Sequence, residues 1–126
     1  MKAPDNLKYT KDHDWLLIEG DIAKIGITDF AQSELGDIVF VDVDTLDDDL
    51  QKEEIYGSVE AVKAVSDLLL PISGDVIEFN ESLEETPENI NKDPYGDGWI
   101  IKVKISNIKE LANLLNAEAY KELVAG

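Results

Sequence analysis

Residues 56–74 read YGSVEAVKAVSDLLLPISG and give the strongest local signal in the chain. Before Lys63, apolar and polar side chains alternate, which is typical of a strand with one buried face. The predicted buried face holds Ile55, Val59 and Ala61, and the predicted outer face holds Ser58 and Glu60. Ser66-Asp67 then interrupts the apolar pattern, and residues 68–72 are apolar again. The stretch therefore predicts two strands joined by a polar turn, with Lys63 near the tip of that turn.

Short β-rich segments occur on both sides of this stretch. The further strands that we predict are residues 15–19, 22–27, 38–43, 75–79 and 99–105. Helical signals are limited to a short helix at residues 29–35, capped by Thr28, and a C-terminal helix that begins at Asn107 and is broken near Asn116. Several short strands with frequent turns favour a mainly β sandwich or barrel over a parallel α/β sheet.

A weak internal repeat relates two of the predicted strands. Residues 36–41 (GDIVFV) and 74–79 (GDVIEF) share the pattern Gly-Asp-apolar-apolar-any-apolar, with an offset of 74 − 36 = 38 positions. Two quasi-symmetric sheets would produce such a repeat. The polar segment 82–98 is predicted to be a long surface loop with one helical turn that starts at Pro87.

The composition sets limits on what the chain can do. Its 126 residues suit one domain spanning residues 1–126. The formal net charge of −17 repels nucleic acid phosphates and anionic lipid, and every basic side chain is a lysine, so arginine's bidentate grip on phosphate is lacking. The chain has no cysteine, so redox chemistry would have to come from an attached group. Because no apolar run approaches the length of a membrane helix and the start MKAPDN has no secretion signal, we expect a cytoplasmic protein. We also expect a monomer.

On its own, Lys63 would be interpreted as one more exposed turn lysine. However, EAVKAVSD at residues 60–67, followed by PISGDV at residues 71–76, resembles the attachment signature of the glycine cleavage H-protein family. The other segments that resemble this family are residues 7–9, 13–15, 25–32, 35–41, 93–99 and 118–120, with Asn91. Two departures are mild: Asp14 stands where glutamate is commoner, and residues 68–70 are more apolar than usual.

The resemblance implies a lipoyl-domain-like barrel-sandwich hybrid with two quasi-symmetric sheets, and a carrier that is not itself an enzyme. In this family the lysine of the signature, here Lys63, carries lipoate in amide linkage. The implied partners are glycine decarboxylase, which loads an aminomethyl group, aminomethyltransferase, which takes its carbon, and dihydrolipoamide dehydrogenase, which reoxidises the carrier. Lipoate-protein ligase or octanoyltransferase is the implied modifying enzyme. Tethering the cofactor to the carrier raises its effective concentration at each partner in turn.

Other residues near the signature have candidate roles. Glu60, Ser66 and Asp67 flank Lys63 and are candidates for recognition by the modifying enzyme or for contact with the lipoyl arm. The aminomethyl adduct has a protonatable amine and is prone to hydrolysis, so a partly shielded pocket with carboxylates would hold it better than open water. We expect Asp14 and Asp67, with Asp12, to serve in this pocket. The alternative is that they are turn and capping acids.

Three other interpretations stay open. The first is a related lipoyl module, either a relay carrier or a module of a 2-oxoacid dehydrogenase. The dehydrogenase modules usually have Asp-Lys-Ala at the turn, whereas Val62 precedes Lys63 here. The second is a biotin carrier, which usually has methionines in place of Val62 and Ala64. The third is an unmodified β-sandwich binding protein, or an enzyme with an unseen site.

Several features that could suggest a site are better explained in other ways. Aspartates at positions 42, 44, 47, 48 and 49 suggest a calcium loop, but Leu46 stands at a ligand position and the turn glycine is missing, so we expect a solvated acidic loop. His13 is the only histidine and is expected to be structural. Trp15 and Trp99 are expected to be core or interface anchors.

Overall fold

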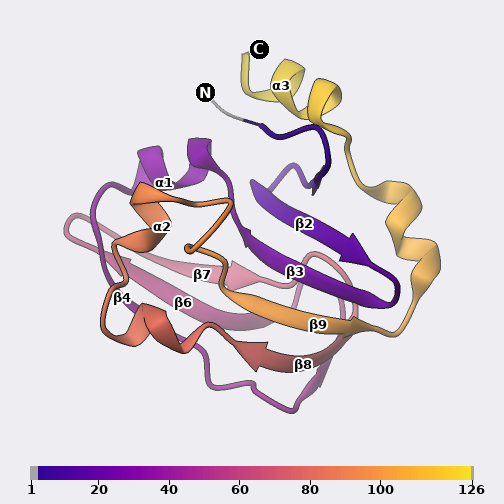
Figure 1. The fold of residues 1–126 in the computed structure, drawn as a ribbon, viewed down its shortest axis with the longest axis horizontal. Coiled ribbons are helices and arrows are strands. Elements are labelled where there is room, and N and C mark those ends of the chain that lie inside the picture. The colour runs from indigo at the N-terminus through magenta and orange to yellow at the C-terminus, as the bar shows by residue number, and fades with distance from the viewer. Residues whose placement is uncertain (1–2, 126) are drawn as a thin grey trace.

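The computed structural model describes residues 3–125, so Met1, Lys2 and Gly126 of the predicted 1–126 domain lie outside the described part. Its strands form two antiparallel sheets (Figure 1). The larger sheet has the order β1-β2-β3-β9-β8-β5, with β1 Lys8–Tyr9, β2 Asp14–Glu19, β3 Ile22–Ile27, β9 Ile101–Ile105, β8 Gly74–Phe79 and β5 Asp49–Leu50. The smaller sheet has the order β4-β6-β7, with β4 Ile38–Asp42, β6 Ile55–Ala61 and β7 Val65–Leu69. The predicted mainly β sandwich is confirmed.

The β2–β3 hairpin forms where two β-rich runs meet at Gly20-Asp21. Its register pairs Glu19 with Ile22, so the connection is two residues long. Gly20 has φ 64°, a left-handed conformation that a residue without Cβ adopts at little cost. Strands β1 and β5 are two residues long, too short to leave an alternating pattern in the sequence, and they were not predicted.

Helix α1 (Asp29–Leu35) forms where it was predicted. The Thr28 hydroxyl accepts a hydrogen bond from the Ala31 N–H at 3.2 Å and so satisfies one of the free donors of the first turn. Gly36 ends the helix, and its N–H donates to the Gln32 carbonyl at 2.9 Å.

The remaining helices are short. The predicted surface loop contains the 3₁₀ helix η1 (Glu81–Glu84) and the four-residue helix α2 (Asn89–Lys92). The C-terminal segment forms the 3₁₀ helix η2 (Ile108–Asn113) and helix α3 (Ala117–Ala125), so the predicted break near Asn116 is confirmed. At the break, Leu115 and Tyr9 exchange two backbone hydrogen bonds of 2.8 Å, which join this segment to β1. No helix within residues 3–125 has the length and apolar character needed to cross a membrane.

The main hydrophobic core lies between the two sheets. Its most deeply buried side chains include Leu16, Ile25, Leu70, Ile72, Ile100 and Ile101. A second cluster lies on the other side of β2, where Tyr9 stacks on Tyr120 of α3 with 4.7 Å between ring centroids. Trp15 belongs to this second cluster, as its predicted role as an anchor requires, and its indole N–H donates to the Pro94 carbonyl at 2.9 Å.

The pairing of β6 with β7 corrects one prediction. Val59 and Ala61 are buried as predicted, but Ile55 is 52% exposed. The register slips between Ile55 and Gly57, which pair with Leu69 and Leu68, and so Tyr56 becomes the inward residue. A one-residue slip moves every following side chain to the other face of a strand, so alternation alone cannot place a residue beyond a bulge.

The two copies of the internal repeat fall in different sheets, one in β4 and one in β8. Their glycines have different roles. Gly36 ends helix α1 in a left-handed conformation, whereas Gly74 lies within β8, where a Cβ would collide with the Lys104 carbonyl. The two copies therefore share a sequence pattern without sharing a local structure.

Candidate functional site

Lys63 lies in the turn between β6 and β7, and its side chain is exposed. The Ala61 N–H donates to the Ala64 carbonyl at 2.7 Å and closes the turn. The Val62 N–H donates to the Asp37 carbonyl at 3.0 Å and ties the turn to the segment before β4. Because both bonds are made by the backbone, the Lys63 amine can be modified without the loss of either.

Gly36 provides space for the Lys63 side chain. A Cβ at position 36 would lie 3.1 Å from Lys63 Cε, which is tighter than an ordinary carbon–carbon contact. Gly36 also has φ 81° and ψ −160°, a combination that glycine alone adopts readily. The residue that ends α1 therefore also allows Lys63 to lie across the end of that helix.

The residues that flank Lys63 lie on two different surfaces. Ser66 and Asp67 line a pocket between β7 and α1, and the Ser66 hydroxyl lies 3.4 Å from the Asp67 carbonyl oxygen to which it donates. Glu60 is exposed, pairs with Val65 across the sheet, and lines neither of the two pockets described below. The structure thus brings Ser66 and Asp67 together with the N-terminal acids and leaves Glu60 apart.

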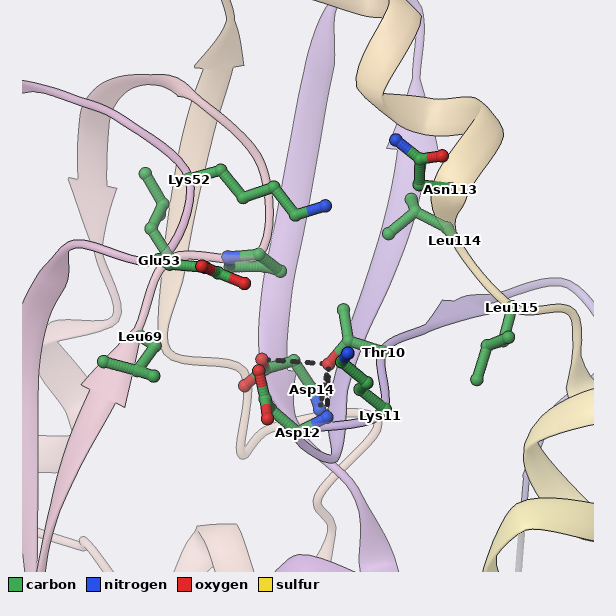
Figure 2. Close-up of a pocket in the computed structure, with 12 residues that line it drawn as sticks. Thr10, Lys11, Asp12, Asp14, Lys52, Glu53, Leu69, Asn113, Leu114 and Leu115 are labelled. Carbon is green, nitrogen blue, oxygen red and sulfur yellow. Dashed lines mark hydrogen bonds between the residues drawn. The ribbon is translucent and has the colours of Figure 1, made fainter.

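Two pockets meet at the residues Asp12, Asp14 and Leu69. The first, here called the α1 pocket, has a volume of about 270 Å³ and is lined by His13, Ile27, Phe30, Ala31, Glu34, Leu35 and Ser66–Leu69 as well. The second, here called the η2 pocket, has a volume of about 250 Å³ and is lined by Thr10, Lys11, Lys52, Glu53, Leu70, Pro71 and Asn113–Leu115 as well (Figure 2). Together they extend along the opening between β2 and the edge strand β7, with Asp14 where they join.

Asp14 is the most unusual acid of the site, because it is only 5% exposed. The Thr10 hydroxyl organises the turn that leads to it. This hydroxyl donates to Asp14 Oδ2 at 3.1 Å and accepts from the Asp14 N–H at 3.2 Å and the Asp12 N–H at 3.3 Å (Figure 2). The carboxyl group is therefore fixed at the start of β2, facing the space between the sheets.

Burial raises the pKa of Asp14 to about 8, the hydrogen bond from Thr10 opposes the rise, and the negative charge of Asp12 adds to it. At neutral pH the Asp14 carboxyl is therefore mostly protonated. A cationic amine placed beside it would favour the charged carboxylate and allow Asp14 to give up its proton. Asp12 and Asp67, which also line the α1 pocket, are exposed.

His13 belongs to a hydrogen-bonded chain that connects the α1 pocket with α3. His13 Nδ1 lies 2.9 Å from the Tyr120 hydroxyl oxygen, which in turn lies 2.6 Å from the Thr28 hydroxyl oxygen. Burial lowers the pKa of His13, so the ring is neutral at neutral pH. His13 has φ 70° and packs on Phe30 with 4.7 Å between ring centroids. Its contacts agree with the structural role predicted for it, although it also lines the pocket.

Two residues of the α1 pocket, and the buried Tyr56 near it, could not be predicted from the local sequence pattern. Phe30 and Leu35 lie on a helix too short to show which face is buried, and only the packing of α1 beside β7 shows that they line a pocket. Tyr56 is fully buried, and its hydroxyl has no hydrogen-bond partner within residues 3–125. Burial raises the pKa of Tyr56 well above its usual value, and the charge of Asp14 raises it further.

The acidic segment between β4 and β5 is a solvated loop, as expected. Asp44, Asp47 and Asp48 lie in this loop, and Asp42 and Asp49 are the strand residues at its two ends. All five side chains are exposed. In the described part of the chain, no group of three or more histidine, aspartate or glutamate side chains is arranged to hold a metal ion.

Comparisons with known proteins give one consistent result. The sequence profile of the family described as Glycine cleavage H-protein matches residues 7–126. A protein named glycine cleavage system H protein from Bacteroides fragilis is 55% identical over 124 residues, which is 98% of each chain. The protein of the same name from Bacteroides thetaiotaomicron is 55% identical over 126 residues, which is 100% of each chain. The one from Staphylococcus carnosus is 50% identical over 124 residues, which is 98% of each chain.

A solved structure shows the same similarity in three dimensions. The crystal structure of a glycine cleavage system H protein from Mycobacterium marinum matches with a TM-score of 0.88 and 36% sequence identity. The match covers 98% of this chain and 100% of that chain. The similarity therefore includes nearly all of the two sheets and the segments that form the two pockets.

Proposed function

The chain belongs to the glycine cleavage H-protein family, and on that basis we propose that Lys63 is the residue that carries lipoate through an amide bond. Members of this family are lipoyl carriers of glycine cleavage and are not catalysts. This protein is likewise a carrier and not a catalyst. The observation that supports Lys63 is its exposed amine on a turn closed by backbone hydrogen bonds. Lys63 is also the only basic residue between Lys52 and Lys92.

Attachment requires the neutral form of the Lys63 amine. Its nitrogen attacks the carbonyl carbon of an activated lipoyl donor, such as an acyl adenylate or an acyl thioester. The N–C bond forms, the bond between that carbon and the donor's leaving group breaks, and the nitrogen releases one proton. The modifying enzyme therefore has to provide a group that accepts a proton from the nitrogen as the bond forms.

We propose that the α1 pocket holds the end of the attached arm. When bound, lipoate supplies a pair of sulfur atoms that carries the aminomethyl group between enzymes. The pocket suits such a group, because Ile27, Phe30 and Leu35 offer apolar contact and Gly36, next to Leu35, lies beside the Lys63 side chain. Asp12, Asp14 and Asp67 line the same pocket and would offer hydrogen-bond acceptors to an amine at the end of the arm.

The named role of the family implies three partner enzymes, which are glycine decarboxylase, aminomethyltransferase and dihydrolipoamide dehydrogenase. We propose lipoate-protein ligase or octanoyltransferase as a fourth partner, and we propose that the carrier is a cytoplasmic monomer. Partners need only brief contact, because the tether keeps the cofactor at a high local concentration.

Intact-mass measurement tests the attachment site. The protein is produced in cells supplied with lipoate, and the mass is expected to rise by one lipoyl group. Lys63→Arg should abolish this gain, while Lys104→Arg, which changes another exposed lysine, should keep it. A lipoyl gain that persists in Lys63→Arg would refute the assignment. A glycine cleavage assay reconstituted with the three partner enzymes then tests whether the holoprotein supports the reaction and the Lys63→Arg protein does not.

A further inference from the structure

The outer face of the three-stranded sheet has a row of three side chains beside the Lys63 turn, in which a glutamate lies between two apolar residues. Phe40 of β4 pairs with Glu60 of β6, and Glu60 pairs with Val65 of β7. Residues directly opposite in an antiparallel sheet project from the same face, so these three side chains stand side by side. Their neighbours Val59 and Ala61 face the core, which identifies the row as solvent-facing.

The exposed area is unusually apolar for the outer face of a sheet. Phe40 is 54% exposed and Val65 is 68% exposed, and Val39 and Val62 beside them are exposed as well. We call these four residues, with Glu60 in their midst, the turn patch. Contiguous exposed apolar side chains next to a modification site are typical of a surface that another protein covers.

The turn patch has an acidic border. The next row across the same strands pairs Asp42 with Ser58 and Ser58 with Asp67, and both aspartates are exposed. Asp67 lies on the edge strand β7, so it borders the turn patch and also lines the α1 pocket. The exposed side chain of Asp37 lies close by, because its carbonyl accepts the hydrogen bond from Val62. Strands β4, β6 and β7 contain no basic residue. A partner that fits this surface must offer apolar side chains to Phe40 and Val65, and basic side chains to Glu60 and the acidic border.

We propose that the turn patch is the docking surface for the enzyme that acylates Lys63. This inference depends on the proposed role of Lys63 and adds the partner that uses the surface around it. The acylating enzyme must bring its active site to the Lys63 nitrogen, at the end of a four-carbon side chain, so its surface has to cover Val62 and Val65. The enzymes of glycine cleavage act on the sulfur atoms at the far end of the attached arm.

The test measures acylation of the unmodified full-length protein by a purified lipoate-protein ligase, followed by intact mass at acceptor concentrations below KM. Phe40→Thr removes the aromatic ring and keeps a residue suited to strands. We expect it to lower kcat/KM for the acceptor protein about tenfold, the size expected for one important interface side chain. Ile77→Thr is the matched control, because Ile77 is 43% exposed on β8 of the other sheet and should leave the rate unchanged.

The same variants separate this inference from its alternatives. Phe40→Thr protein can be fully lipoylated by prolonged incubation. Glycine decarboxylase should then use it at the normal rate, measured as the exchange of the glycine carboxyl group with bicarbonate. An unchanged acylation rate, or equal losses in Phe40→Thr and Ile77→Thr, would overturn the proposal. So would loss of the exchange reaction alone, or a dimer of the unmodified protein that Phe40→Thr dissociates. If Phe40→Thr fails to fold, Val65→Thr probes the same row. Acylation that persists in Lys63→Arg would refute the site itself and not the surface.

Discussion

The Thr10 hydroxyl and the Asp14 carboxyl form a pair in which the hydroxyl donates to Oδ2 at 3.1 Å and accepts from the Asp14 N–H at 3.2 Å. The pair holds a buried acid at the junction of the two pockets. The donated bond favours the charged carboxylate, against a larger effect of burial that favours the neutral acid.

Replacing Thr10 should therefore raise the pKa of Asp14 above its value of about 8. Thr10→Val keeps the branched shape and removes the hydroxyl, so the carboxylate loses a stabilising donor. A hydrogen bond of about 1 kcal/mol corresponds to about 0.7 pKa unit. Carbon-13 NMR titration of the Asp14 carboxyl measures the change. Thr45→Val, which removes a hydroxyl that bonds to the Tyr56 carbonyl instead, is the control and should not shift it. A lower pKa in Thr10→Val would contradict the assignment.

Asp14 should also make stability depend on pH. Its pKa is about 8 in the folded protein and 3.8 as a free side chain, so between these values the folded state binds more protons than the unfolded state. The contribution of Asp14 to stability is therefore present below pH 4 and is lost as the pH rises toward 8, at up to about 1.4 kcal/mol per pH unit.

Urea unfolding of the natural protein and of Asp14→Asn at several pH values isolates this contribution. The free energy difference between the two proteins should shift in favour of Asp14→Asn as the pH rises from 4 to 8. His13, whose pKa is lowered, makes the folded state less stable on the acid side, but it is present in both proteins and cancels in the difference. A difference that stays constant over this range would show that Asp14 ionises in the folded state as easily as in water.

Gly36 has two structural roles, because it ends α1 and leaves space for the Lys63 side chain. Gly36→Ala should destabilise the protein by about 1–3 kcal/mol, because an alanine strains the backbone at φ 81° and ψ −160°. Its Cβ should also displace the Lys63 side chain and slow acylation. Thermal unfolding and the acylation rate measure the two effects. Gly20→Ala is the control, because Gly20 also has positive φ but has no neighbour within 4 Å of a Cβ, so it should lose stability without slower acylation.

The buried, unpaired hydroxyl of Tyr56 in residues 3–125 leads to a further prediction. Tyr56→Phe removes a buried hydroxyl that has no partner in residues 3–125, so it should stabilise the protein by about 1 kcal/mol. Tyr9→Phe is the matched comparison, because the Tyr9 hydroxyl donates to the Pro4 carbonyl at 2.7 Å and its loss should destabilise by a similar amount. Urea unfolding measures both. A destabilised Tyr56→Phe would mean that the hydroxyl has a partner, such as a buried water near Asp14.

Tyr56 also shows which part of the core could not be predicted from the sequence. Alternation along β6 predicted Val59 and Ala61 correctly, because local period determines which side of a strand faces the core. The bulge between Ile55 and Gly57 depends on pairing with β7, which a single segment does not encode, so Ile55 was misplaced and Tyr56 was missed. Helix α1 carried its own cap and terminating glycine and was predicted at the right residues.

In the candidate site, too, local features were predictable and features that depend on the packing of distant segments were not. Lys63 was proposed from the resemblance of one segment to a known family, and its turn followed from the local pattern. The pockets combine α1, β2, β7 and η2, and their shape depends on how far apart β2 and β7 lie in the folded protein. Asp12, Asp14 and Asp67 were proposed as one group, and all three line the α1 pocket, but the deep burial of Asp14 was not predicted.

The role of these acids can be measured on the loaded carrier. If Asp14 and Asp67 hold the amine at the end of the arm, Asp14→Asn and Asp67→Asn should speed the hydrolytic release of the aminomethyl group, with the larger effect, about tenfold, for buried Asp14. The buried side chain matters more because water competes less for its hydrogen bonds. Asp44→Asn makes the same chemical change at an exposed acid of the loop after β4, outside both pockets, and should leave the release rate unchanged. Equal release rates in all four proteins would show that the arm is protected by apolar contact alone, and that these aspartates serve the fold.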